Sequence, residues 1–234
     1  MTAWNIAAIF LVAGVPSAAG FTALPKTAFA GVEASGTSKG AEQWVKARFE
    51  AGKALAERKV EAGSPGEAKW HKDIKALFDE TIDWETMTRD ALGTQWRSRT
   101  PKEKAEFSTL LREMIEASYQ SKLRLAARGE LKKPLELSID WLPSPVLGSE
   151  STDDALVISA DVRADRQKAR LGFKVHRAKA GWRVIDVSID DVSTVRTYRS
   201  QFRKLIAQEG FAGLLTRMRK KTEDIRSGRA ELAP

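Results

Sequence analysis

The spacing of apolar residues changes twice along the chain, and this order of patterns constrains the fold more than any other feature. Residues 41–129 carry apolar side chains three and four positions apart, which is typical of amphipathic helices. Residues 135–189 alternate apolar and polar side chains, as strands with one buried face do. Residues 194–220 return to helical spacing. This order predicts an α+β fold with a curved antiparallel sheet of about four strands, covered by helices on one face.

Capping residues divide the first helical part. Residues 63–66 (GSPG) should end the first helix, and Asp83 should cap a helix that ends at Gly93. Residues 100–103 (TPKE) place Thr at the N-cap, Pro at the first helical position and Glu at the third, which is a capping box. The helix that begins there should continue to Gly129 and cross the whole domain.

Four alternating segments follow, at 135–141, 156–162, 171–175 and 182–189. A loop at 142–154 and turns near residues 165–167 and 178–181 separate them, so we expect an antiparallel meander. The chain then returns to helix, with one segment before Gly210 and a short one after it.

Composition excludes several kinds of chemistry. The chain has no cysteine, and its two histidines, His71 and His176, lie more than 100 positions apart. Disulfides, thiolate nucleophiles and Cys-based metal sites are therefore excluded, and no histidine metal site is expected. The sequence contains no GxGxxG, GxxxxGK[ST] or GxSxG motif. We therefore predict no catalytic residue, no metal site and no cofactor.

The N-terminus has the features of an export signal. Residues 3–24 carry no charge, and residues 6–15 form an apolar run too short to span a bilayer. Small residues at Ala28 and Ala30 fit a cleavage site, and residues 17–19 are an earlier candidate. We predict a signal peptide at 1–30, a flexible leader at 31–40, a single domain at 41–221 and a flexible tail at 222–234. Because residues 1–5 lack Lys and Arg, an uncleaved membrane anchor is the alternative.

The chain is basic, with 39 Lys and Arg against 31 Asp and Glu, a formal net charge of +8. In an exported protein this charge does not indicate nucleic-acid binding. It fits lipid headgroups, a membrane surface or an acidic protein, or it serves only solubility.

Asp186 lies in a strand otherwise made of Val and Ile. A buried carboxylate needs a partner, so we predict a structural role in which Asp186 pairs with Arg199 or with a backbone donor. A catalytic Asp186 is the alternative. The acid pairs at 153–154 and 190–191 are interpreted as solvated turn residues.

Residues 181–202 (GWRVIDVSIDDVSTVRTYRSQF) resemble the signature of the MlaC or toluene-tolerance family. Residues 83–87 (DWETM), 91–97 (ALGTQWR) and 210–215 (GFAGLL) resemble its other marked stretches. The family consists of periplasmic phospholipid-binding proteins that work with an ABC transporter of Gram-negative bacteria. This chain differs in Asp191, where the family usually has Gly, which predicts a different turn, and in a longer 142–154 loop.

The resemblance implies an apolar lipid pocket between the sheet and the helices. The chain would be a periplasmic shuttle, not an enzyme, carrying glycerophospholipid between the outer and inner membranes to maintain outer-membrane lipid asymmetry. Implied partners are an inner-membrane ABC transporter complex with its substrate-binding ring protein and an outer-membrane lipoprotein; the shuttle itself would be a monomer with no cofactor. The apolar stripes supply the candidate lipid-binding residues, which could equally form a dry core: Leu111, Ile115, Tyr119, Ile158, Phe173, Val175, Val184, Val195, Tyr198, Phe202 and Ile206.

Two other functions stay open from the sequence. An enzyme with a cone-shaped α+β pocket would need a general acid or base, for which Tyr119, Tyr198 and Asp186 are the candidates. An adaptor protein of the transporter that binds no lipid would have a solid core.

Overall fold

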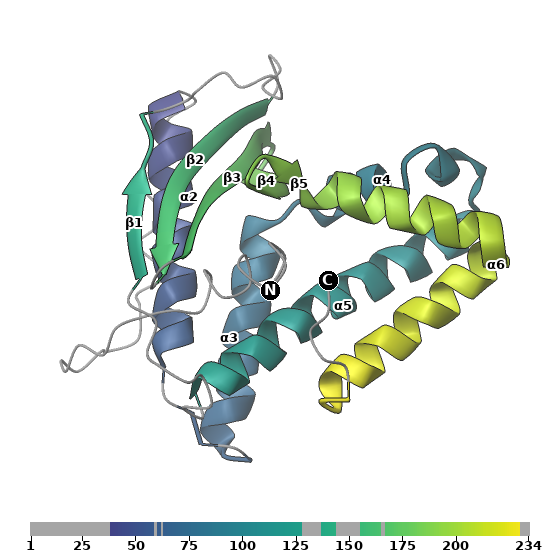
Figure 1. Ribbon diagram of the computed structural model, residues 1–234, viewed down its shortest axis with the longest axis horizontal. Coiled ribbons are helices and arrows are strands. Elements are labelled where there is room, and N and C mark those ends of the chain that lie inside the picture. The colour runs from purple at the N-terminus through teal and green to yellow at the C-terminus, as the bar shows by residue number, and fades with distance from the viewer. Residues whose placement is uncertain are drawn as a thin grey trace.

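A five-stranded antiparallel sheet and a layer of helices make up the computed structural model, which describes residues 38–58, 60–61, 63–127, 137–143, 155–164 and 167–229 (Figure 1). The predicted α+β class is confirmed. The helices before the sheet are α2 (Ser38–Glu57), α3 (Pro65–Thr81), α4 (Trp84–Leu92), the 3-10 helix η2 (Gly93–Ser98) and α5 (Pro101–Ala127). The strands are β1 (Leu137–Trp141), β2 (Ala155–Ala164), β3 (Gln167–Ala178), β4 (Gly181–Ile189) and β5 (Val192–Ser193), and helix α6 (Thr194–Arg226) follows.

The sheet is a meander, with strand order β1-β2-β3-β4-β5 and antiparallel pairing throughout. Strands β1 to β4 correspond to the four predicted strands. The short strand β5 was not predicted, because two residues are too few to show an alternating pattern. The register shifts between Lys174 and Val175, which leaves Ile185 as an extra residue on β4.

One face of the sheet is apolar and packs against α2. Residues directly opposite each other on paired strands share a face, so Ile158, Phe173 and Val187 lie side by side. Trp44 and Phe49 of α2 cover this face, and together these residues belong to one buried cluster, here called the sheet cluster. Figure 1 shows α2 running along the sheet.

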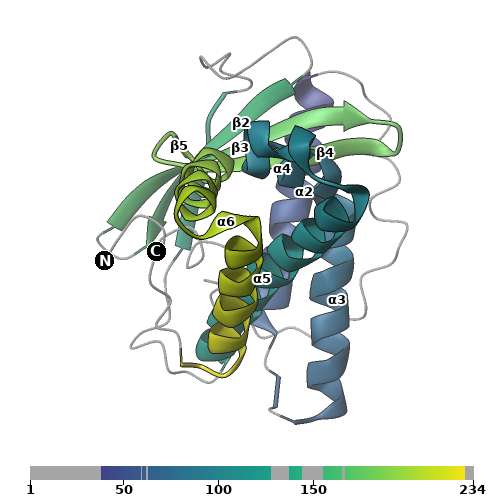
Figure 2. The same ribbon diagram turned by 90° about the vertical axis from the view of Figure 1, so that its right-hand side faces the viewer.

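A second buried cluster, here called the helix cluster, joins α4, α5 and α6 and includes Phe107, Leu111, Phe202 and Leu214. A third, here called the α3 cluster, joins Leu55 of α2, Trp70 and Ile74 of α3 and Tyr119 of α5. In both views α3 and α5 extend beyond the end of the sheet (Figures 1 and 2).

The capping residues predicted for α4 and α5 occupy the predicted positions, whereas α2 ends at Glu57, before residues 63–66, and Ser64 caps the start of α3. The Asp83 carboxylate accepts a hydrogen bond from the Thr86 amide at 2.9 Å, and Gly93 follows the last residue of α4. At the start of α5, the Thr100 amide donates to Glu103 Oε2 at 2.8 Å, and the Glu103 amide donates to Thr100 Oγ1 at 3.3 Å. The capping box is therefore confirmed.

Helix α6 bends at Gly210, whose φ of 72° and ψ of 176° are not helical, so the two predicted segments are arms of one bent helix. Its second arm continues to Arg226, past the boundary predicted at residue 221, because Thr222 and Ile225 are buried. Helix α2 begins at Ser38, within the leader predicted at 31–40. The predicted signal peptide at 1–30 and most of the 142–154 loop lie outside the described residues.

Candidate functional site

The candidate lipid-binding residues are half-buried or buried, but they are not all together. Ile158, Phe173, Val175 and Val184 lie in the sheet cluster. Tyr119 is the one candidate that lies in the α3 cluster. The helix cluster contains the others: Leu111, Ile115, Val195, Tyr198, Phe202 and Ile206. The predicted set thus lines two main apolar regions, one under the sheet and one between the helices.

Three aromatic rings gather around Phe49 of α2. The Phe49 ring lies 5.7 Å from Trp141 and 6.3 Å from Phe173 between centroids, and Trp141 lies 6.2 Å from Phe173. The candidate set includes Phe173 but misses Phe49 and Trp141. Both fall on apolar stripes in the sequence, and only the fold brings the three rings together.

The helix cluster also has an aromatic centre. Phe107 packs edge-on against Phe202 with centroids 5.5 Å apart, and Tyr198 stacks on Phe202 at 5.4 Å. Burial raises the pKa of the Tyr198 phenol, and it raises that of Tyr119 in the α3 cluster. Both phenols are therefore protonated at neutral pH, which makes them poor general bases.

Hydrogen bonds hold the Asp186 carboxylate at the start of α6. The side chain is buried, and its Oδ1 accepts a hydrogen bond from the Val195 amide at 3.0 Å. Oδ2 accepts one from the Ser193 hydroxyl, and Ser193 Oγ in turn accepts one from the Arg196 amide at 3.0 Å. The first amides of a helix have no acceptor within the helix. Asp186 and Ser193 supply such acceptors and fix the start of α6 on the sheet.

Of the two partners predicted for Asp186, the backbone donor is confirmed, whereas Arg199 serves another contact. Arg199 Nε donates to the carbonyl oxygen of Asp90 at 2.6 Å. Its stem passes over Gly93, where an added Cβ would lie 3.0 Å from Arg199 Cδ. Arg199 therefore joins α6 to the end of α4. The amide at the helix start competes better for Asp186, because it needs no ordering of a long side chain.

A second carboxylate joins the sheet to α4. Asp83 Oδ2 lies 2.8 Å from Nε2 of His176 on β3, and the Asp83 amide donates to the carbonyl oxygen of Val184 on β4 at 3.0 Å. Burial alone would raise the pKa of the Asp83 carboxyl, but hydrogen bonds from the Thr86 amide and hydroxyl and the His176 ring hold it below its usual range. Sequence reasoning identified Asp83 as a cap and missed His176, which lies 93 positions away.

Hydrogen bonds hold three titratable side chains where the sheet meets the helices. Asp186 and Asp83 are held by helix amides, and His176 is held by Asp83. Within the described residues no group of three or more His, Asp or Glu side chains could hold a metal ion.

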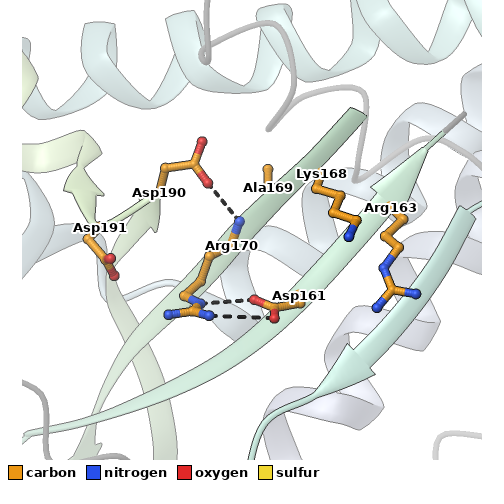
Figure 3. Close-up of a pocket in the computed structure, with 7 residues that line it drawn as sticks. All are labelled: Asp161, Arg163, Lys168, Ala169, Arg170, Asp190 and Asp191. Carbon is orange, nitrogen blue, oxygen red and sulfur yellow. Dashed lines mark hydrogen bonds and ion pairs between the residues drawn. The ribbon is translucent and has the colours of Figure 1, made fainter. Parts of the chain in front are cut away.

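A hollow of about 350 Å³ lies at the end of the β2–β3 hairpin beside the β4–β5 turn (Figure 3). Its lining is charged, and Arg170 Nε donates to Asp161 Oδ1 across it at 2.9 Å. A lining of this kind suits polar groups and not acyl chains. The residues around it are Asp161, Arg163, Lys168, Ala169, Arg170, Asp190 and Asp191.

The β4–β5 turn consists of Asp190 and Asp191, with φ of 48° and 64°. Both values lie in the left-handed region that favours glycine. Asp190 is held by the Arg170 backbone, whose amide donates to Asp190 Oδ1 at 2.8 Å. A glycine at 191 could make the same turn, so Asp191 by itself does not require the different turn that we predicted.

The comparisons with known proteins agree with this architecture. The fold is that of a solved phospholipid-binding protein from Ralstonia solanacearum, whose structure holds a phospholipid; the TM-score is 0.60 at 20% identity, and the match covers 79% of this chain and 98% of that chain. The model of the MlaC family, described as MlaC protein, matches residues 53–220. The chain therefore belongs to the MlaC family, as residues 181–202 predicted. A search of curated proteins finds no match.

Proposed function

We propose that this chain is a periplasmic carrier that binds one glycerophospholipid and moves it between the outer and inner membranes for an ABC-type transport system. The observation that carries the proposal is the family match over residues 53–220. MlaC proteins form a family of lipid-binding transport proteins. The structural relative from Ralstonia solanacearum, which holds a phospholipid, adds support.

Two buried apolar regions support the choice of acyl chains as the cargo. The sheet cluster presents a continuous apolar face on four strands, and the helix cluster presents a second apolar region. We propose that the acyl chains enter between these regions and contact the candidate residues on both. Leaving the headgroup at the surface would avoid the cost of burying a phosphate.

Energetics explain why such a carrier is needed. Two acyl chains contain roughly 30 methylenes, and exposing them to water costs on the order of 20 kcal/mol at about 0.8 kcal/mol each. A membrane and a protein pocket shield these groups equally, so transfer between them is close to neutral in free energy. The direction of transport would therefore come from the partners: the inner-membrane complex with its ring protein and ATPase, and the outer-membrane lipoprotein.

Export to the periplasm forms part of the proposal, since residues 1–30 have the pattern of a signal peptide. No helix in the described part of the chain is long and apolar enough to cross a membrane.

Lipid transfer between vesicles tests the function. Donor vesicles would carry a self-quenched fluorescent phospholipid, and acceptor vesicles would carry none. We expect the purified protein to accelerate dequenching in proportion to its concentration. A rate equal to that without protein would contradict the carrier function and favour a non-lipid adaptor.

A variant pair tests the candidate contacts. Ile206 and Leu205 are both half-buried against the helix cluster, but only Ile206 is a predicted lipid contact. Ile206→Gln should slow transfer, because the amide would face the acyl chains. The matched control Leu205→Gln should leave transfer near the wild-type rate. Equal effects of the two substitutions would remove Ile206 from the predicted contacts.

A further inference from the structure

Positive charge is concentrated in two segments that meet at one end of the helical layer. Residues 194–208, the first arm of α6, contain four basic residues and no acidic one. Residues 93–104, in η2 and the start of α5, contain four basic residues and one acid, Glu103. We call the six basic side chains at this end the basic tip: Arg97, Arg99, Lys102, Lys104, Arg203 and Lys204.

The second segment lies against the residue that follows the bend of α6. The Arg99 guanidinium lies over the Phe211 ring, 4.7 Å from its centroid, immediately after the bend of α6. The Phe107 ring near the start of α5 contacts the same ring at 6.4 Å. The bend of α6 and the start of α5 come together at the end of the helical layer away from β1 (Figure 1).

The rest of α6 is different, because most of its cations form ion pairs with carboxylates. Arg217 makes a bidentate ion pair with Glu209, Lys220 pairs with Asp224 at 2.6 Å, and Arg219 pairs with Glu106 of α5. By contrast, Arg203 and Lys204 are exposed and have no carboxylate partner in the described part of the chain. The unbalanced charge therefore belongs to the first arm and the tip, not to the whole helix.

We propose that the basic tip docks the protein reversibly on membranes that contain anionic phospholipids. Charge complementarity favours this partner, since each Lys or Arg near an anionic bilayer contributes about 1 kcal/mol. Trp96 adds a half-buried indole beside Lys104, whose Nζ lies 5.5 Å from the ring centroid, and indoles favour the headgroup level of a bilayer.

An acidic protein surface fits the tip less well. Protein interfaces centre on buried apolar and aromatic side chains surrounded by a polar rim. Among the described residues, Val192 of β5 is the exposed large hydrophobic side chain, and it lies outside the tip. A surface with cations and no exposed apolar centre suits a charged headgroup layer. The inference deepens the proposed carrier function, because docking would bring the pocket to its lipid source.

Vesicle sedimentation with a charge-reversal pair tests the proposal. Full-length mature protein would be mixed with vesicles of phosphatidylcholine alone or with one third phosphatidylglycerol. We expect binding to the anionic vesicles only, weakening as salt is raised. The double variant R203E/K204E should bind at least tenfold more weakly, because two attractive charges become repulsive.

The matched control is K72E/K179E, which changes the net charge equally at exposed positions on α3 and in the β3–β4 turn. It should keep most of the wild-type binding. Equal losses in the two double variants, equal binding to both vesicle types, or an acidic partner protein bound by the tip without any vesicle binding would overturn the proposal. Extraction of bound lipid from each protein separates the two proposals. Protein that docks normally but holds no lipid would contradict the carrier function and not the basic tip. Protein that holds lipid but does not dock would contradict the basic tip and not the carrier function.

Discussion

The buried carboxylate of Asp186 should be one of the most sensitive polar positions in the protein. It accepts hydrogen bonds from the Val195 amide at 3.0 Å and from the Ser193 hydroxyl, and it lies at the start of α6. Asp186→Ala removes both interactions and leaves the Val195 amide without its acceptor. Negative charge at a helix N-terminus is also favourable, so the substitution loses that attraction as well.

The expected magnitude follows from these contacts. A hydrogen bond to a charged group contributes roughly 1.5–3 kcal/mol, and a buried amide without a partner costs roughly 1–3 kcal/mol. Because losing the hydrogen bond is also what leaves the amide unpaired, the two costs are not simply added, and we expect Asp186→Ala to lower the free energy of unfolding by about 3 kcal/mol. For a chain of this size that corresponds to a fall in Tm of about 6–12 °C. Asp186→Asn keeps a side-chain oxygen as acceptor and should lose only about 1 kcal/mol.

Urea unfolding followed by circular dichroism measures these differences. Asp161→Ala is the control, since Asp161 lies on the neighbouring part of the sheet but pairs with Arg170 at the surface, where both side chains are at least 40% exposed. It should cost about 0.2–1 kcal/mol. If Asp186→Ala destabilised the protein no more than Asp161→Ala, the assignment of Asp186 as the anchor of α6 would be wrong.

Three further substitutions test the local geometry. The pKa of Asp83 is held below its ordinary value of 3.8, so its ionised form stabilises the fold above that pH and loses this effect as the pH falls through the lowered folded-state pKa. The urea midpoint of Asp83→Asn should therefore lie below that of the wild type at pH 7 and approach it below pH 3.8. A difference that stays constant with pH would contradict this. Asp191→Gly should raise the free energy of unfolding by roughly 0.5–1 kcal/mol, because Asp191 has a φ of 64°, and a lower urea midpoint would refute the strain. Gly93→Ala should lower the free energy of unfolding by about 1–2 kcal/mol, since φ at Gly93 is 60° and the new Cβ would press on Arg199. An unchanged Tm would contradict that close packing.

Local signals in the sequence predicted the local structure well. The caps at Asp83 and Thr100 and the break at Gly210 depend on neighbouring residues, so their identities suffice to predict them. The alternation of β2, β3 and β4 predicted strands with one buried face, and that face is the sheet cluster.

Contacts between distant segments could not be predicted in the same way. Periodicity shows that Ile158 and Phe202 are buried, but not that they belong to different clusters. The contact of His176 with Asp83 depends on how the sheet packs against α4, which no local pattern encodes. Arg199 shows the same limit, because its separation from Asp186 in sequence did not reveal the nearer carbonyl of Asp90.

The central claim is that this MlaC-family protein holds a phospholipid, and native mass spectrometry of protein purified from the exported fraction without detergent tests it most directly. We predict a chain that begins at Gly31 with an adduct of the mass of one phospholipid, and solvent extraction of the same sample should identify that lipid. A bare chain that also takes up no phospholipid from vesicles would contradict the account.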